Sequence, residues 1–164
     1  LGLRLLASSS LAWKSTSPKP FLSYPSCWNI KWFGDLNNGP SDETRQFNNA
    51  LKVFRETNVD VWGLSEISSN SIFNRLLDSL ESYDGVIAPY SQTQKTALIY
   101  DTSLFRLLYG KVVITNQNYD FASGRFPFEV ALLPKYGDQT DTLIWYIFQL
   151  KYFQLNYFPT NVLI

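Results

Sequence analysis

Hydrophobic and polar positions in the first part of the chain follow a strand pattern and then a helical pattern. Residues 26–33 have the composition of a buried strand. This strand should end at the glycine and the segment dense in turn formers that follow it. A helical spacing follows. Either Ser41 or Asp42 can cap this helix, which we expect to end near residues 57–58. Its apolar stripe consists of Phe47, Ala50, Leu51 and Phe54.

The chain continues with one more strand and helix and then becomes mostly extended. A short apolar segment over 59–66 predicts the second strand, and an amphipathic pattern over 70–81 predicts the second helix. Further strands are predicted over 85–90, 95–100, 107–114, 125–133 and 141–150. This order indicates an α+β protein with a mixed, largely antiparallel sheet and helices on its outer face, not an all-parallel doubly wound fold.

The 164 residues suffice for one domain with a substantial core, which we expect over 26–151. Residues 1–25 read as an irregular leader or signal-peptide remnant, and 152–164 as an aberrant or truncated tail. Arg4 interrupts the apolar run of the leader, so an amphipathic turn or a mistranslated leader explains it equally well. A signal-peptide remnant would make the protein secreted or periplasmic. No run approaches the roughly 18 apolar residues of a membrane span.

Charge and composition narrow the possible chemistry. Fourteen basic and fourteen acidic residues give a formal charge of zero, so phosphate or nucleic-acid binding requires a local patch or a metal. The single cysteine, Cys27, excludes an internal disulfide and a cysteine-based zinc site. The sequence contains no histidine, which removes the commonest general base and the commonest transition-metal ligand.

Asn29 and Glu66 are the first candidates for chemistry. Asn29 lies inside a predicted strand, where asparagine is depleted because its side chain competes for backbone hydrogen bonds. A strand–helix–strand crossover returns the chain in parallel beside its first strand, so Asn29 and Glu66 can share one carboxyl edge. An amide oxygen and a carboxylate there suit Mg²⁺. Alternatively, Glu66 simply begins the following loop or caps the next helix.

Arg125 is the third candidate, because it follows a glycine and starts a predicted strand. A guanidinium on such a loop rim can hold a phosphate oxygen through two hydrogen bonds. A surface ion pair with Glu129 or Asp120 is the alternative. Tyr100 and Asp101 end another predicted strand and can line the same rim, although core packing explains the tyrosine at least as well.

Four short motifs occur in order along the chain and together resemble one protein family. They are W-N-I-K-W-F-G-D at 28–35, D-V-W-G-L-S-E-I at 60–67, K-T-A-L-I-Y-D at 95–101 and S-G-R-F-P-F-E at 123–129. The set resembles the DNase I-like endonuclease/exonuclease/phosphatase superfamily, especially secreted bacterial members with N-I-x-W-F-G near the start. The resemblance implies a four-layer sandwich, with two mixed sheets face to face and helices outside. The chain resembles only the first half of that fold.

The same resemblance implies roles for the candidate residues. Glu66 would be a metal ligand, with Mg²⁺ as the expected ion and Mn²⁺ or Ca²⁺ as substitutes. Asn29 would help arrange the metal–phosphate centre and is a candidate ligand itself, and Arg125 would contact the substrate phosphate. The function implied is a metal-dependent phosphodiester hydrolase, nuclease-like, that acts on nucleic acid or another phosphodiester.

The sequence also departs from the family pattern. Gln149 stands where the family has a histidine at the end of a strand, and the later Asp-x-Asn and Asp-His elements have no counterpart. Glutamine can hold a phosphate oxygen but has no proton that titrates near neutral pH. We therefore expect the chain to be inactive or nearly so. We also expect an incomplete second sheet, with an uncovered apolar face that favours self-association.

Two other functions fit the same sequence. One is a non-catalytic binding module in which exposed aromatic residues stack on bases or sugars or dock a partner protein. The aromatic residues concerned are Trp32, Phe33, Tyr90, Phe126 and Phe128. The other is a non-functional fragment.

Overall fold

The computed structural model describes residues 24–116, 121, 124–136 and 142–149. The predicted tail over 152–164 and the predicted leader, apart from residues 24 and 25, lie outside the described residues. Those two predictions, and the secreted or periplasmic location that follows from the leader, stay predictions. In the part of the chain that is described, no helix is both long and apolar enough to cross a membrane.

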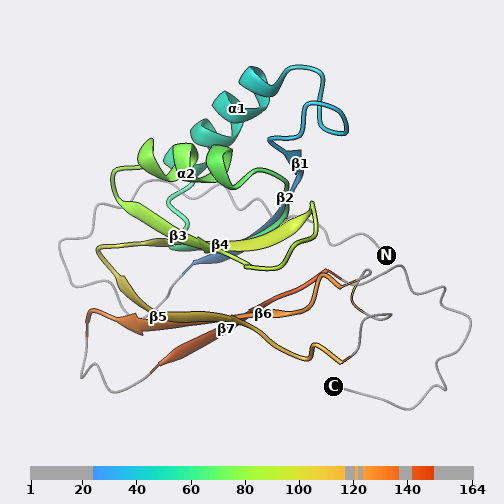
Figure 1. Cartoon of the computed structure of the whole chain (residues 1–164). Coiled ribbons are helices and arrows are strands. Elements are labelled where there is room, and N and C mark those ends of the chain that lie inside the picture. Colours follow the sequence, from blue (N-terminus) through green and yellow to red (C-terminus); the bar gives the residue numbers. More distant parts are fainter. Residues whose placement is uncertain (1–23, 117–120, 122–123, 137–141, 150–164) are drawn as a thin grey trace, which may run out of the picture.

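Nine elements are described, in nearly the predicted order (Figure 1). They are β1 (Pro25–Phe33), α1 (Glu43–Glu56), β2 (Val61–Ile67), α2 (Asn70–Asp78), β3 (Tyr83–Ile87), β4 (Lys95–Asp101), β5 (Phe105–Val112), β6 (Phe128–Pro134) and β7 (Leu143–Ile147). The predicted boundaries of most elements differ from these by one to three residues. The differences matter most for two candidate residues. Arg125 was predicted inside a strand but precedes β6, and Gln149 was predicted inside a strand but follows β7.

The described strands form two sheets. The first has the order β1-β2-β4-β3, with β1 and β2 parallel and the other pairs antiparallel. The second has the order β5-β6-β7 and is antiparallel throughout. The mixed α+β class is therefore confirmed. The largely antiparallel pairing and the helices on an outer face are confirmed as well, and the two sheets implied by the family resemblance are present.

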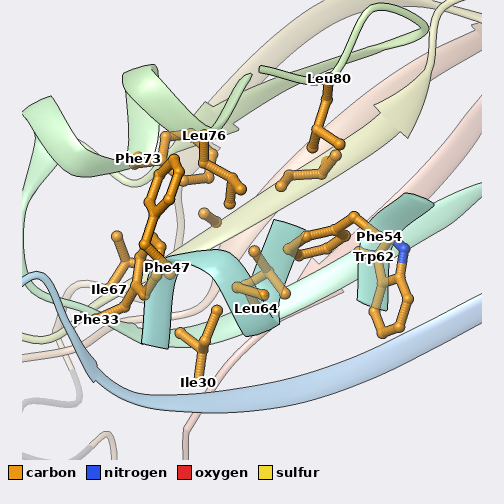
Figure 2. Packing of buried hydrophobic residues seen from close by; sticks show 13 residues of the cluster. Ile30, Phe33, Phe47, Phe54, Trp62, Leu64, Ile67, Phe73, Leu76 and Leu80 are labelled. Carbon is orange, nitrogen blue, oxygen red and sulfur yellow. The ribbon is translucent and has the colours of Figure 1, made fainter. Parts of the chain in front are cut away.

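Helices α1 and α2 lie on the outer face of the first sheet, and the second sheet lies on its other side (Figure 1). Asp42, not Ser41, caps α1, because its side chain accepts a hydrogen bond from the backbone N–H of Arg45 at 2.8 Å. Of the predicted stripe, Phe47, Ala50 and Phe54 are buried against the sheet. They belong to a cluster in which Trp62 meets Phe54 edge to face (Figure 2).

A second apolar cluster fills the space between the two sheets. Alternate residues of β6, namely Phe128, Val130 and Leu132, point into it and are fully buried. This burial explains why the last three strands pack face to face with the first sheet and do not extend its edge. Phe33 is 1% exposed and Phe128 0% exposed, so neither is a surface aromatic as the binding-module hypothesis requires.

Candidate functional site

The crossover through α1 brings Asn29 and Glu66 together. Asn29 pairs with Ser65 in the parallel ladder between β1 and β2, which places Glu66 one residue further along its strand. The Asn29 Nδ2 atom donates a hydrogen bond to Glu66 Oε1 at 2.9 Å. The predicted neighbourhood of the two side chains is thus present. Glu66 does not cap α2, since Ser69 accepts the hydrogen bond from the backbone N–H of Ile72.

Both strands depart from regular geometry at this point. The ladder between β1 and β2 is interrupted between Asn29 and Phe33. Lys31, Trp32 and Glu66 adopt left-handed φ values of 51°, 53° and 64°. This conformation costs a residue with a side chain roughly 1–2 kcal/mol. Such strain persists only where the surroundings enforce it, and it gathers at functional sites.

Hydrogen bonds from neighbouring side chains hold the irregular turn in β1. Asn29 Oδ1 accepts from the backbone N–H of Lys31 at 2.9 Å, so the asparagine side chain bridges its own turn and Glu66. Gln46 of α1 donates through Nε2 to the carbonyl oxygens of Ile30 and Lys31, at 2.8 Å each. Because Asn29 accepts from a backbone N–H and donates to a carboxylate, the orientation of its amide group follows from the network.

The second sheet completes the site with Gln149 and Arg125. Gln149 Nε2 donates to Glu66 Oε1 at 3.2 Å, and Arg125 Nη1 donates to Gln149 Oε1 at 3.3 Å. Arg125 Nη1 also donates to Gln94 Oε1, in the loop before β4. A continuous hydrogen-bonded chain therefore runs from Asn29 through Glu66 and Gln149 to Arg125. It joins the carboxyl ends of β1 and β2 to the ends of the second sheet.

Arg125 and Gln149 occupy loop positions, not strands. Arg125 lies three residues before β6, and Gln149 two residues after β7. Of the two ion-pair partners considered for Arg125, Asp120 lies outside the described residues. Glu129 forms a salt bridge with Lys111 at 2.8 Å. Gln94 was not predicted from the sequence, because an amide in a polar loop has no pattern that distinguishes it from other loop residues.

Tyr100 and Asp101 do not line this rim, and of the two alternatives for the tyrosine, core packing is confirmed. Strand β4 runs antiparallel to β2, and Tyr100 pairs with Val61 at the opposite end of β2 from Glu66. Tyr100 is 4% exposed, and its hydroxyl donates to Asp84 Oδ2 at 3.3 Å. Burial, together with the nearby Asp84 carboxylate, raises the pKa of Tyr100 to about 12. This tyrosine is therefore a neutral core residue.

The oxygens around Glu66 fit one class of metal ion. Among the described residues, no group of three or more His, Cys, Asp or Glu side chains is placed to hold a metal. A protein-caged zinc site would need such a group. Glu66 Oε1 is occupied by two amide donors, while no described residue donates a hydrogen bond to Oε2. A carboxylate oxygen that accepts nothing from the described part of the chain suits Mg²⁺, which keeps several waters and completes its shell with substrate phosphate.

No model of a protein family matches the sequence, and no curated protein matches it. Solved structures do match. An endonuclease/exonuclease/phosphatase from Bacteroides vulgatus aligns with a TM-score of 0.56 and 14% identity, over 68% of this chain and 46% of that one. The fold is the endonuclease/exonuclease/phosphatase fold. The resemblance inferred from the sequence motifs is therefore confirmed at the level of the fold.

Two further structures with this fold give the same result. A humanized TDP2 of D. rerio aligns with a TM-score of 0.55 and 13% identity, over 72% of this chain and 45% of that one. An endonuclease/exonuclease/phosphatase family protein from Bacteroides thetaiotaomicron aligns with a TM-score of 0.52 and 13% identity, over 74% of this chain and 48% of that one. The present chain thus spans a little under half the length of each of these structures.

Proposed function

We propose that this chain carries the metal- and phosphate-holding part of a phosphodiester hydrolase. The observation behind the proposal is the hydrogen-bonded chain from Asn29 through Glu66 and Gln149 to Arg125. It holds a carboxylate and a guanidinium near each other at one end of both sheets. A cation ligand and a phosphate ligand are the two charged groups that binding of a metal-associated phosphodiester requires.

Each residue of this chain has a distinct role in the proposal. Glu66 would hold the divalent cation through Oε2, to which no described residue donates a hydrogen bond, and Asn29 keeps the carboxylate in that orientation. When bound, Mg²⁺ supplies charge neutralisation at the scissile phosphate. Arg125 binds a phosphate oxygen through its guanidinium. Gln149 fixes the spacing between carboxylate and guanidinium without adding a charge of its own.

We expect this site to bind a phosphodiester with little turnover. The Gln149 amide cannot accept or release a proton near neutral pH, and the sequence contains no histidine. Nucleic acid or another phosphodiester is the substrate class implied. The burial of Phe33 and Phe128 removes two of the five aromatic residues that the binding-module alternative relies on.

A magnesium titration tests the proposal. Mg²⁺ should raise the melting temperature and strengthen the binding of bis(4-nitrophenyl) phosphate, a simple phosphodiester. Glu66→Gln should weaken Mg²⁺ binding by about tenfold or more, as changes at or near metal ligands do. Arg125→Gln should weaken diester binding by about tenfold, while Mg²⁺ binding without diester stays near the wild-type value. Glu81→Gln, an exposed carboxylate outside this hydrogen-bonded chain, is the matched control.

Two results would contradict the proposal. If Mg²⁺ changes neither the melting temperature nor the diester affinity of the wild type, the site is not a metal–phosphate centre. If supercoiled plasmid is nicked at the same Mg²⁺-dependent rate by the wild type and Glu66→Ala, hydrolysis takes place without Glu66, and its assignment as metal ligand is wrong.

A further inference from the structure

Gln46 is a residue of α1 with no charge and no reactive group, yet its amide is directed at the strand that carries Asn29. Both Nε2 hydrogens are used, one on the carbonyl of Ile30 and one on the carbonyl of Lys31, at 2.8 Å each. These carbonyls lie in the interrupted part of β1, where the ladder with β2 has stopped after Asn29 and resumes at Phe33. Gln46 thus donates hydrogen bonds to two backbone carbonyls at a point where the ladder with β2 is interrupted.

The same two carbonyls belong to the turn that sets the direction of Asn29. The backbone N–H of Lys31 donates to Asn29 Oδ1, and Lys31 itself is in the left-handed conformation with φ of 51°. If the Ile30–Lys31 segment relaxes, Asn29 Oδ1 loses its donor, and the amide is free to turn away from Glu66. Every link from Gln46 to the Glu66 carboxylate is therefore a direct hydrogen bond or a single residue of strained backbone.

The oxygen of the same amide lacks the partners that the nitrogen has. Gln46 Oε1 is buried and finds no hydrogen-bond partner among the described residues. A buried acceptor without a partner is destabilising, and an apolar side chain of similar shape avoids this cost. Gln46 thus gives two hydrogen bonds to β1 and leaves one buried acceptor without a partner among the described residues.

We propose that Gln46 is a positioning residue of the candidate site, which aims the Asn29 amide at Glu66 by holding the Ile30–Lys31 turn. The proposal rests on the proposed function for its consequence, the orientation of a metal-binding carboxylate. Its structural part, the dependence of Asn29 on Gln46, stands on the hydrogen bonds alone. Gln46 also borders a cleft of about 430 Å³ between β1 and α1, so a substituted side chain has room to be accommodated.

The test compares Gln46→Leu, which removes both donors, with Gln46→Lys, whose ammonium group restores donors toward the two carbonyls. Asn49→Leu, on the same helix and bordering the same cleft, is the matched control, because no hydrogen bond links Asn49 to β1 among the described residues. The first readout is the side-chain amide resonance of Asn29 in a ¹⁵N–¹H spectrum, assigned from its loss in Asn29→Asp. The second is the affinity for Mn²⁺ alone, measured by electron paramagnetic resonance.

We expect Gln46→Leu to move the Asn29 resonance to the position it takes in Glu66→Gln and to weaken Mn²⁺ binding about tenfold. Gln46→Lys should recover most of both signals, and Asn49→Leu should change neither. If the Asn29 resonance of Gln46→Leu stays at the wild-type position, the proposal is overturned. If Gln46→Leu does not fold, Gln46→Ala replaces it. Failure of both to fold also overturns the proposal, because Gln46 would then serve overall stability.

The two readouts separate this proposal from the proposed function. Wild-type protein that binds no Mn²⁺ contradicts the metal site, but the Asn29 resonance still shows whether Gln46 positions that side chain. Conversely, Mn²⁺ binding that is sensitive to Glu66 but not to Gln46 keeps the proposed function and removes Gln46 from it.

Discussion

At the scale of single residues, the candidate site depends on backbone conformations that its side chains do not favour. Glu66 has a φ of 64°, in the region that glycine adopts freely and other residues avoid. In that conformation the carboxylate oxygen Oε1 accepts from Asn29 of the neighbouring strand and from Gln149 of the other sheet. Glycine at this position would relieve the strain but would remove the carboxylate and both of its hydrogen bonds.

The strain at Glu66 predicts an inverted order of stability between glycine and alanine variants. Both Glu66→Gly and Glu66→Ala lose the carboxylate, but only Glu66→Ala keeps a Cβ in the left-handed region. Glu66→Gly should therefore be more stable by about 1 kcal/mol, measured as the free energy of unfolding in urea. Ser65 does not have a positive φ, so the usual order should hold there. Ser65→Ala should have a higher free energy of unfolding than Ser65→Gly. An alanine variant at 66 as stable as the glycine variant would contradict the strained backbone.

At the scale of elements, the second sheet contains a charged row across its three strands. Lys111 of β5 lies opposite Glu129 of β6, which lies opposite Tyr146 of β7. Lys111 Nζ is 2.8 Å from Glu129 Oε1, and the Tyr109 hydroxyl donates to the same oxygen at 3.0 Å. The hydrogen bond from Lys111, together with those from the two tyrosines, holds the pKa of Glu129 below its ordinary value. Ionised Glu129 therefore stabilises the pairing of β5 with β6.

The lowered pKa of Glu129 predicts how this stabilisation depends on pH. A carboxylate with a depressed folded-state pKa contributes stability above its unfolded-state pKa and loses it as the pH falls through the folded-state value. Lys111→Met should therefore lower the urea midpoint at pH 7, and the difference from the wild type should shrink below the ordinary pKa of a glutamate. Lys52→Met, at an exposed position of α1, should show no such dependence. If the urea midpoint of Lys111→Met lies below that of the wild type by the same amount at pH 3 and at pH 7, Lys111 acts through packing and not through its charge.

At the scale of the whole molecule, the described elements cover the two sheets unequally. Helices α1 and α2 cover the outer face of the first sheet, whereas no helix among the described residues covers the outer face of the second (Figure 1). The strand register places Tyr109, Ala131 and Ile144 in one row of that face. Tyr109 is 40% exposed, Ile144 42% and Tyr146 56%. The row of Lys111, Glu129 and Tyr146 lies beside it on the same face, so the face combines exposed apolar side chains with one ion pair. A surface with exposed apolar side chains can form a contact between copies of the chain.

Self-association through this face therefore remains a prediction with a direct test. Sedimentation velocity over a hundredfold range of concentration should show a species that grows with concentration. Ile144→Lys should weaken this association by about tenfold, because a lysine ammonium resists burial in an apolar contact. Leu36→Lys replaces a side chain that is 82% exposed in the loop after β1 and should leave the association unchanged. A wild type that stays monomeric at every concentration would contradict the prediction.

The sequence by itself determined the local units and their order. The apolar periodicity of α1, its cap and the parallel return of β2 beside β1 follow from short-range geometry and the handedness of crossovers, so the meeting of Asn29 with Glu66 was predictable. The strand pattern did not divide the strands between two sheets, which only the motif resemblance implied; the tertiary structure decided that β5, β6 and β7 form the second sheet and bury Phe128. It also decided that Gln149 bridges Glu66 and Arg125, that Gln94 joins them, and that Lys31 and Glu66 adopt left-handed backbone. These features depend on packing between segments far apart in the chain, which a local pattern does not encode.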